Sequence, residues 1–496
     1  MRQLDVAKHT AGSRWQIWID LALLALLLLL SVYFVYVASQ SLARIFFVAL
    51  LIVFFFSKKD YLWFAFFLII MWTPGYLFSD FSGLSAKRLP LYSFIPGWSF
   101  TPLEFFLMLA FVKAIIYGKK VDFVFKRAFI PVLFYAALLL LLSFFVYGTS
   151  GRSIERTLIG FANFTIFISF SYLIYRQRDI QRFIYLLSPI VFFVLFEQLF
   201  YIIAGYRIID LLSPGYMQLM MLETGDPRFI MGGEMVLFFG YISSLLLLQQ
   251  KHNRLLGIYL YCVIIACFLS VFLSATRIWF IVFSFIMLCY VLFSTRNVKT
   301  FVKLAIAAIL IFVFAMGSQP LRSAMVGAWD RIDQIEAVAQ GNFADAPTFQ
   351  FRFSARLPRL LVGLKQNWII GWGFSDEYFR YSDGHVGNFD LLLQVGVVGF
   401  LLFSYLWIFY FRTIFRARSV KGGGGLGKDP LAVLAFAFAA MLIAHFSTYL
   451  WFTLVPNRRS GIFLLVFISI SEFYIRITKH KIGMKSEMIG NRGGRI

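Results

Sequence analysis

The chain has 496 residues, 60% of them hydrophobic and 14% charged, and its mean hydropathy is +0.80. Soluble domains average about 45–50% apolar and about 25% charged residues, so this composition excludes an ordinary soluble protein and indicates a polytopic membrane protein. The formal net charge is +22 at pH 7. Because the basic residues are dispersed over many loops rather than clustered on one face, we expect no nucleic-acid partner.

Apolar runs recur along the whole chain, each close to the roughly 20 residues that cross a bilayer as a helix. The first run follows the basic segment MRQLDVAKHTAGSR and is too long for a cleaved signal, so we expect it to be retained. The sequence predicts one all-α membrane domain, residues 1–496, with about 12–14 transmembrane helices. The candidate spans are 15–38, 42–57, 61–78, 101–117, 128–147, 158–175, 183–203, 231–250, 255–274, 278–294, 301–317, 389–411, 430–454 and 461–476.

Lysine and arginine mark one set of the loops, and the connections that alternate with them are poor in basic residues. Basic loops face the cytoplasm, so both termini are expected there. This set includes a basic, glycine-rich linker at 412–429 and a basic tail at 477–496. The other basic segments are SKKD, GKKVDFVFKR, YRQRDIQR, KHNR and STRNVK.

Arginine predominates over lysine on the opposite, outer side. An arginine fork binds phosphate bidentately, whereas lysine acts as a point charge, so the bias favours a phosphorylated or otherwise anionic ligand. The alternative is that these arginines pair with carboxylates such as Asp330, Asp333 and Asp376. The outer basic residues are Lys87 and Lys365 against Arg44, Arg88, Arg152, Arg156, Arg207, Arg228, Arg277, Arg322, Arg331, Arg352, Arg356, Arg359, Arg380, Arg458 and Arg459.

Residues 318–388 form an outer loop far longer than the usual few residues. Two segments within it, 321–340 and 352–373, have amphipathic helical spacing, and GNFADAPT between them indicates a turn. Such helices would lie on the outer membrane surface or over a cavity, so we expect a lid. The apolar stripes are Leu321, Met325, Ala328, Ile332 and Ile335 in the first helix, and Leu357, Leu360, Leu361 and Leu364 in the second.

Soluble catalytic motifs and metal-ligand spacings are absent from the sequence. It contains no G-x-x-x-x-G-K-[ST] segment for ATP, and GGGG at 422–425 follows no strand, which favours a flexible linker. Cys262, Cys267 and Cys289 all fall in apolar runs, as expected of buried thiols. We therefore expect neither a metal nor a cofactor.

Polar residues at the outer ends of spans remain as candidates for a site. Arg277 begins a span in SATRIW, Arg228 and Glu234 lie in DPRFIMGGEM, and Arg352 opens the second lid helix. An arginine near hydrocarbon is costly unless it is paired, which favours a functional role. Snorkelling of the side chain to the interface is the alternative.

The stretch GWGFSDEYFRYSDGHVGNFDLLLQVGVVGFLLF, residues 371–403, places His385 and Asn388 just before an apolar span. A histidine suits a general base near neutral pH. A lone interfacial histidine is also a common structural residue, so the chemistry alone leaves both roles open. Glu197 and His445 lie within spans, where we expect internal pairing and structural roles.

Taken in chain order, these segments resemble the signature of bacterial O-antigen ligases and O-antigen polymerases. That signature is an arginine-led helix, a G-x-G, a His-Asn pair and an apolar span with G-x-x-G. SATRIW is similar to the family's Ser-Arg pair and RFIMGGEM to its Arg-then-Gly segment, whereas Thr276 and Val386 depart from it. The matching positions, within roughly residues 225–410, are Arg228, Arg277, Arg352, Gly371, Gly373, His385, Gly396 and Gly399.

The resemblance implies a metal-independent, inverting membrane glycosyltransferase of the GT-C type in the bacterial inner membrane, with its site facing the periplasm. Its donor would be an undecaprenyl-diphosphate-linked glycan and its acceptor a sugar hydroxyl. His385 and Arg277 would be catalytic, and Arg228, Arg277 and Arg352 would bind the diphosphate. Membrane lipids, a chain-length regulator and a flippase are the expected partners. Secondary candidates are Arg152, Arg156, Glu234, Asn388 and Trp372, and Trp368, Trp372, Phe374 and Tyr378 are expected to stack on sugars.

These motifs do not separate two acceptors. A repeat-unit polymerase, favoured slightly by the number of spans, would extend another lipid-linked glycan, and a ligase would use lipid A-core. The alternative from another class is a flippase or polysaccharide transporter, which would be expected to carry cationic residues in a central cavity and two similar halves. No internal repeat is evident, and the polar residues concentrate on the outer side.

Overall fold

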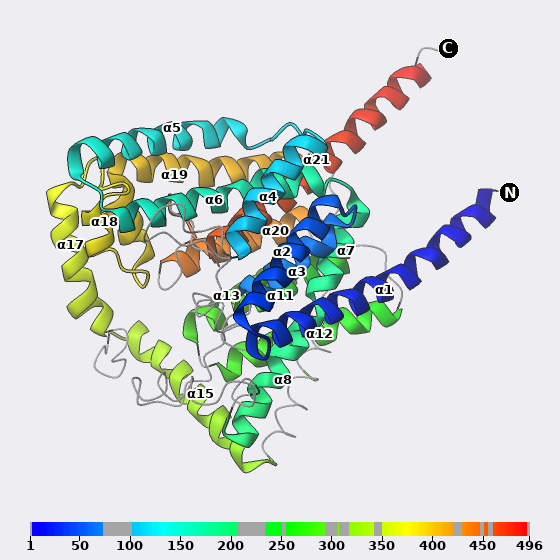
Figure 1. Ribbon diagram of the computed structural model, residues 1–496, viewed down its shortest axis with the longest axis horizontal. Coiled ribbons are helices and arrows are strands. Elements are labelled where there is room, and N and C mark those ends of the chain that lie inside the picture. The colour runs from blue at the N-terminus through cyan, green and yellow to red at the C-terminus, as the bar shows by residue number, and fades with distance from the viewer. Residues whose placement is uncertain are drawn as a thin grey trace.

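The computed structural model describes residues 2–72, 102–206, 208, 234–249, 254–274, 276–292, 306, 317–341, 350–419, 429–446, 451–454 and 460–493. Every regular element in these residues is a helix (Figure 1). They are α1 (Arg2–Tyr36), α2 (Gln40–Phe56), α3 (Asp60–Trp72), α4 (Pro102–Tyr117), α5 (Lys126–Leu142), the π-helix η4 (Ser143–Tyr147), α6 (Gly151–Leu173), α7 (Gln177–Leu187), α8 (Pro189–Ala204), α11 (Glu234–Leu248), α12 (Arg254–Leu273), α13 (Arg277–Leu292), α15 (Gln319–Ala339), the π-helix η6 (Arg352–Arg356), α17 (Leu357–Gln366), α18 (Asp376–Tyr381), α19 (Gly387–Ser419), α20 (Pro430–His445) and α21 (Ser460–Gly493).

Six helical segments in the described residues are long and apolar enough to cross a membrane, as expected of a multi-pass membrane protein. The all-helical membrane fold is thus confirmed for these residues, and the total number of spans stays a prediction. The candidate span at 301–317 lies almost wholly outside the described residues. The six segments are Gln16–Val35, Lys126–Tyr147, Gln177–Ala204, Arg254–Leu273, Gly387–Arg418 and Ser460–Lys479.

The helices differ in how much apolar surface they bury. Every residue of α3 after Asp60 is buried, which shows that other helices surround it. A helix in such a position is apolar on all its faces. The α5–η4 segment instead leaves Phe134 and Phe145 74% and 83% exposed. Large exposed aromatic side chains on a long apolar helix mark a surface that contacts lipid.

The helices pack into a bundle whose two ends differ (Figure 1). α5 lies along α19, and α6 contacts both α4 and α21. α15 and α17 follow one side of the bundle with α18 beside α17, whereas the free ends of α1 and α21 project from the opposite side (Figure 1). α19 and α21 continue as helices through Arg412–Ser419 and through residues 477–493 of the segments predicted as linker and tail.

Within residues 318–388, expected to form a long outer loop, the structure has α15 and the helical segment formed by η6 and α17. The expectation that the second helix reaches residue 373 is wrong, because it ends at Gln366 and 368–373 is non-helical. In α15, Met325 and Ala328 are 3% and 2% exposed, and Met325 packs with Ile202 and Leu273 at the ends of α8 and α12. In the second segment Leu360 is fully buried. It forms a small apolar cluster with Tyr378, Val386 and Leu393, to which Leu364 also packs. The apolar stripes therefore face the protein at these positions, and α17 rests on the start of α19.

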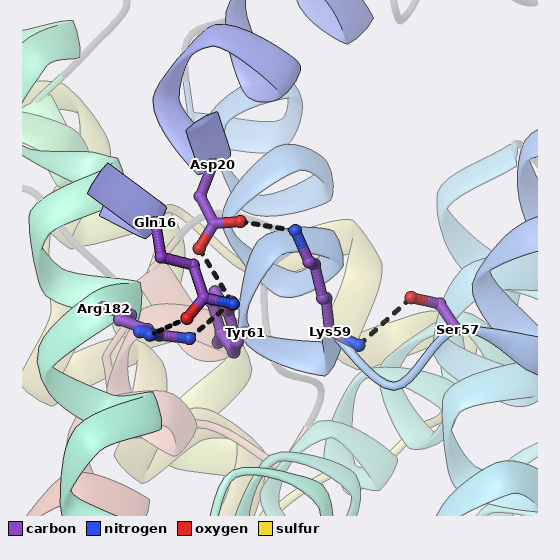
Figure 2. A network of polar contacts seen from close by, with 6 residues as sticks. All are labelled: Gln16, Asp20, Ser57, Lys59, Tyr61 and Arg182. Atoms are coloured by element: carbon purple, nitrogen blue, oxygen red, sulfur yellow. Dashed lines mark hydrogen bonds and ion pairs between the residues drawn. The ribbon is translucent and has the colours of Figure 1, made fainter. Parts of the chain in front are cut away.

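A network of buried polar residues joins α1, α3 and α7 (Figure 2). Asp20 is 1% exposed and accepts hydrogen bonds from Lys59 Nζ at 2.7 Å and from the Tyr61 hydroxyl at 2.8 Å. Arg182 donates to Tyr61 Oη at 3.0 Å and to Gln16 Oε1 at 2.7 Å. Buried charges are tolerated when they are paired and hydrogen-bonded, and both carboxylate oxygens of Asp20 are engaged here. The network thereby holds the three helices together.

Candidate functional site

His385 lies on the turn between α18 and α19, and two carboxylates shape that turn. Asp383 Oδ1 accepts the His385 backbone N–H at 3.0 Å. Asp390, which is fully buried, accepts the Asp383 backbone N–H at 2.8 Å and the Tyr378 hydroxyl at 3.0 Å. Burial, reinforced by the charge of Asp390, raises the pKa of Tyr378 well above its ordinary value, so its hydroxyl stays a donor. The buried carboxylate of Asp390 therefore fixes the backbone of the turn at Asp383.

His385 is partly buried, and its Nδ1 is closed off from solvent and makes no hydrogen bond within the described part of the chain, so a ligand reaches this nitrogen only if the ring turns. The backbone of this residue is fixed by Asp383, whereas the ring is left for another partner. A histidine with a fixed backbone and an unengaged ring nitrogen can exchange a proton or a hydrogen bond with a ligand.

Arginines from η6 and α17 border the same turn. Arg356 Nη1 lies 3.2 Å from Asp383 Oδ1, and Arg359 donates to Ser382 O at 3.2 Å. Arg352, which the sequence singles out, begins the preceding π-helical turn and is partly buried. Arg356 and Arg359 thus bring two guanidinium groups to Asp383 and Ser382, two and three residues before His385.

α19 is broken inside its apolar run, at Gly396, whose φ and ψ are 61° and −175°. The segment 368–373 lies against the break and takes up the main-chain groups that the helix leaves unpaired. Non-helical backbone at membrane depth is tolerated only where protein or water satisfies it in this way. The four bonds are Trp372 N to Leu393 O (2.9 Å), Gly373 N to Gln394 O (2.8 Å), Val397 N to Trp368 O (2.9 Å) and Val398 N to Ile369 O (3.1 Å).

Glycine is required at the crossing of these two segments. A Cβ on Gly371 would overlap Gly396 N, and a Cβ on Gly396 would overlap Ile369 O. Both residues also have positive φ, which an L side chain rarely adopts. From α5 the Tyr135 hydroxyl lies 2.7 Å from Ile370 O and 2.9 Å from Val395 O. The glycines that resemble a family signature therefore have a direct structural reason, which is close backbone approach.

A second buried non-helical segment, Trp451–Leu454, follows α20. Its Trp451 N–H donates to His445 Nδ1 at 3.2 Å, and its Leu454 N–H donates to Gln394 Oε1 at 2.8 Å. The expectation that His445 has a structural role is supported by this contact. Gln394 joins both irregular segments, because its carbonyl accepts from Gly373 and its side chain accepts from Leu454.

Arg277 is the first residue of α13, and Trp451 connects this end of α13 with the start of α19. The rings of Trp279 and Trp451 are 6.3 Å apart. Trp451 is bonded to His445, whose carbonyl oxygen lies directly against Gly387, two residues after His385. Arg277 thus begins α13 and His385 lies two residues before α19, and both of these helices pack against α20.

The start of α6 contributes further contacts to α18. Arg156 stacks over Phe379 at 5.1 Å, and Arg152 is exposed near the same helix start. Asp376 accepts hydrogen bonds from Ser153 and, at 2.8 Å, from Ser150. Burial alone would raise the pKa of Asp376, but the bonds from Ser153 and Ser150 outweigh it and hold the pKa below its usual value.

Other candidates occupy different environments. Glu234 begins α11 and is partly buried, and Asn388 lies in the first turn of α19. Trp372 donates from its indole N–H to Gly363 O at 2.8 Å and packs edge-on against Tyr147. Arg228 lies outside the described residues.

The expectation that four aromatics stack on sugars is wrong for Phe374 and Tyr378. They are 1% and 4% exposed, because Phe374 belongs to the main core and Tyr378 to the cluster under α17. Trp368 is 54% exposed and stays available. Sequence reasoning also missed Asp390 and Gln394, although a carboxylate and an amide inside an apolar span are uncommon enough to have drawn notice.

An apolar cavity lies beneath Trp451–Leu454, bordered by α5, α6, α19 and α21. No charged side chain lines it, and its volume is about 50 Å³. Its walls include Phe129, Phe164, Phe403 and Leu465. Its apolar walls offer no hydrogen-bonding partner to a sugar or a phosphate, and its volume is far below that of a ligand pocket.

No group of three or more histidine, cysteine, aspartate or glutamate side chains in the described residues is placed to hold a metal ion. Comparison of the chain with protein-family models and with curated proteins gives no match.

Proposed function

We propose that the protein is a membrane glycosyltransferase that moves a glycan from undecaprenyl diphosphate to a sugar hydroxyl, most readily as a repeat-unit polymerase. The observation that carries the proposal is the turn of His385. Its backbone is fixed by Asp383 and Asp390, its ring Nδ1 is unengaged, and arginines border it at one end of a membrane bundle.

The chemistry that such a site can perform is a single displacement. The acceptor hydroxyl oxygen forms a bond to the anomeric carbon as its proton passes to the ring of His385, and the bond from that carbon to the diphosphate oxygen breaks. The departing diphosphate takes the electron pair, and the developing charge needs fixed cationic donors. Arg277, Arg352 and Arg228 are assigned this role. Charge-assisted hydrogen bonds contribute about 1.5–3 kcal/mol each, so three would be substantial.

The irregular backbone segments support a substrate site at this end of the bundle. In membrane proteins, broken helices mark binding sites because their freed backbone groups must be satisfied by protein or ligand. Here the break at Gly396 and the segment Trp451–Leu454 meet at Gln394, close to the start of α19.

The test is glycan transfer by the purified protein in lipid vesicles supplied with the lipid-linked glycan. A polymerase lengthens the glycan with no other acceptor present, whereas a ligase forms product only when lipid A-core is added. Transfer is expected to persist in EDTA. If neither acceptor gives product, or if lipid-linked glycan crosses the bilayer unchanged, the proposal is wrong, and the second result would indicate a flippase.

A further inference from the structure

Two arginines, Arg356 at the end of η6 and Arg359 in α17, contact the turn that carries His385. Arg356 and Arg359 are three residues apart, a spacing that places them on one face of a helix. Arg356 Nη1 lies 3.2 Å from Asp383 Oδ1, and Arg359 donates to the adjacent Ser382 O at 3.2 Å. The two guanidinium groups therefore contact Asp383 and Ser382, which lie two and three residues before His385.

The ion pair formed by Arg356 and Asp383 is partly exposed to solvent, and it engages only one of the guanidinium nitrogens. The side chains are 31% and 13% exposed, and a single guanidinium nitrogen contacts the carboxylate. A guanidinium carries five N–H donors. The remaining donors of Arg356 make no hydrogen bond within the described residues, although its face stacks on Phe351 at 5.4 Å. A ligand with more oxygens than one carboxylate could accept hydrogen bonds from the guanidinium N–H groups of Arg356 that Asp383 does not contact.

The turn itself does not depend on Arg356. Asp383 Oδ1 accepts the His385 backbone N–H at 3.0 Å, and the Asp383 N–H donates to buried Asp390 at 2.8 Å. These contacts join residues of the turn and the start of α19, and none involves α17. The carboxylate can therefore release Arg356 and still hold the backbone of His385.

We propose that Asp383 is an internal competitor for an anionic donor, so that a diphosphate displaces it from Arg356 and is then held by Arg356 and Arg359 together. This inference rests on the proposed function for the identity of the ligand as a diphosphate. Phosphate oxygens suit the exchange because they accept the arginine fork bidentately. The exchange places the diphosphate beside His385 and couples donor binding to the docking of α17 on the turn.

Binding can be measured without turnover, on the full chain in nanodiscs of zwitterionic lipid. One arm uses inorganic pyrophosphate and the other undecaprenyl diphosphate, which separates a free from a lipid-linked ligand. Asp383→Asn keeps an oxygen for the His385 N–H but removes the competing charge, so Kd is expected to fall about two- to fivefold in both arms, the range for a partly exposed ion pair. Arg356→Gln is expected to raise Kd about tenfold.

The double variant should bind like Arg356→Gln alone, because Asp383 competes only through Arg356. Glu377→Gln is the matched control, since it removes the carboxylate partner of Arg380, 3.6 Å away on α18, and should leave Kd unchanged. An unchanged or higher Kd in Asp383→Asn for either ligand would overturn the exchange. Because the assay needs no transfer, a protein that binds as described but transfers no glycan would refute the proposed function and leave the exchange intact.

Discussion

Replacing Gly396 by alanine tests whether the break in α19 is locked by the segment 368–373. Gly396 has φ of 61°, and its Cβ would overlap Ile369 O. With ψ of −175° Gly396 lies in a region essentially confined to glycine, where an L residue costs about 1–3 kcal/mol in strain. Each of the four main-chain bonds across the break contributes about 0.5–1.5 kcal/mol. Strain with the loss of two bonds gives a destabilisation of about 2–6 kcal/mol.

The assay is thermal and denaturant unfolding of the protein in detergent, with amide hydrogen exchange at 368–373 and 393–398 as a local readout. Gly327→Ala is the matched control, because a Cβ at this helical position of α15 meets nothing within 4 Å. That variant should be neutral or more stable by up to about 1 kcal/mol, as alanine favours helix over glycine. If Gly396→Ala unfolds like Gly327→Ala with unchanged exchange, the lock does not exist.

Three further predictions concern other contacts. His445→Ala should lower the thermal midpoint, because the Trp451 N–H loses its acceptor at a cost of about 1–3 kcal/mol. Glycan transfer per folded molecule should be retained. Loss of transfer at unchanged stability would contradict the structural role of His445. Asp20→Ala should destabilise by about 3 kcal/mol, since it leaves buried cationic and hydroxyl partners unmatched, and an unchanged midpoint would refute the role of the network. Because folding lowers the pKa of Asp376, its ionised carboxylate contributes fully to stability above the unfolded pKa of about 3.9, and this contribution is lost as pH falls through the folded pKa. Amide protection at the start of α6 should therefore fall in acid, and Asp376→Asn should remove this pH dependence. An identical pH profile in both proteins would contradict the prediction.

The membrane fold could be predicted from sequence because it depends on apolar length, and the amphipathic stripes of the outer loop because they depend on helical period. Met325 and Leu360 are buried as their spacing predicts. Gly371 and Gly396 drew attention only through a resemblance, and their physical role is an approach between segments 25 residues apart in the chain. Such pairing leaves no local pattern to read.

The candidate site could be predicted only in part, because some of its contacts also leave no local pattern in the sequence. His385 and the arginine-rich character of the second helix are visible in the sequence, but the choice of Asp383 and Asp390 as the groups that hold the turn is not. Short polar residues near a helix start have many possible local partners. Phe374 and Tyr378 show the converse error, because an aromatic in an interfacial loop can point into the core as easily as toward a ligand.

The most direct test of the central claim is the rate of glycan transfer by His385→Ala and Arg277→Ala in vesicles, each first shown to keep the thermal midpoint of the unchanged protein. The account predicts that the histidine variant loses about 100-fold or more, the lower range for removal of a general base, and that the arginine variant also falls by at least about tenfold through loss of one charge-assisted contact. Near-normal rates in both folded variants would contradict the assignment of this end of the bundle as the site of transfer.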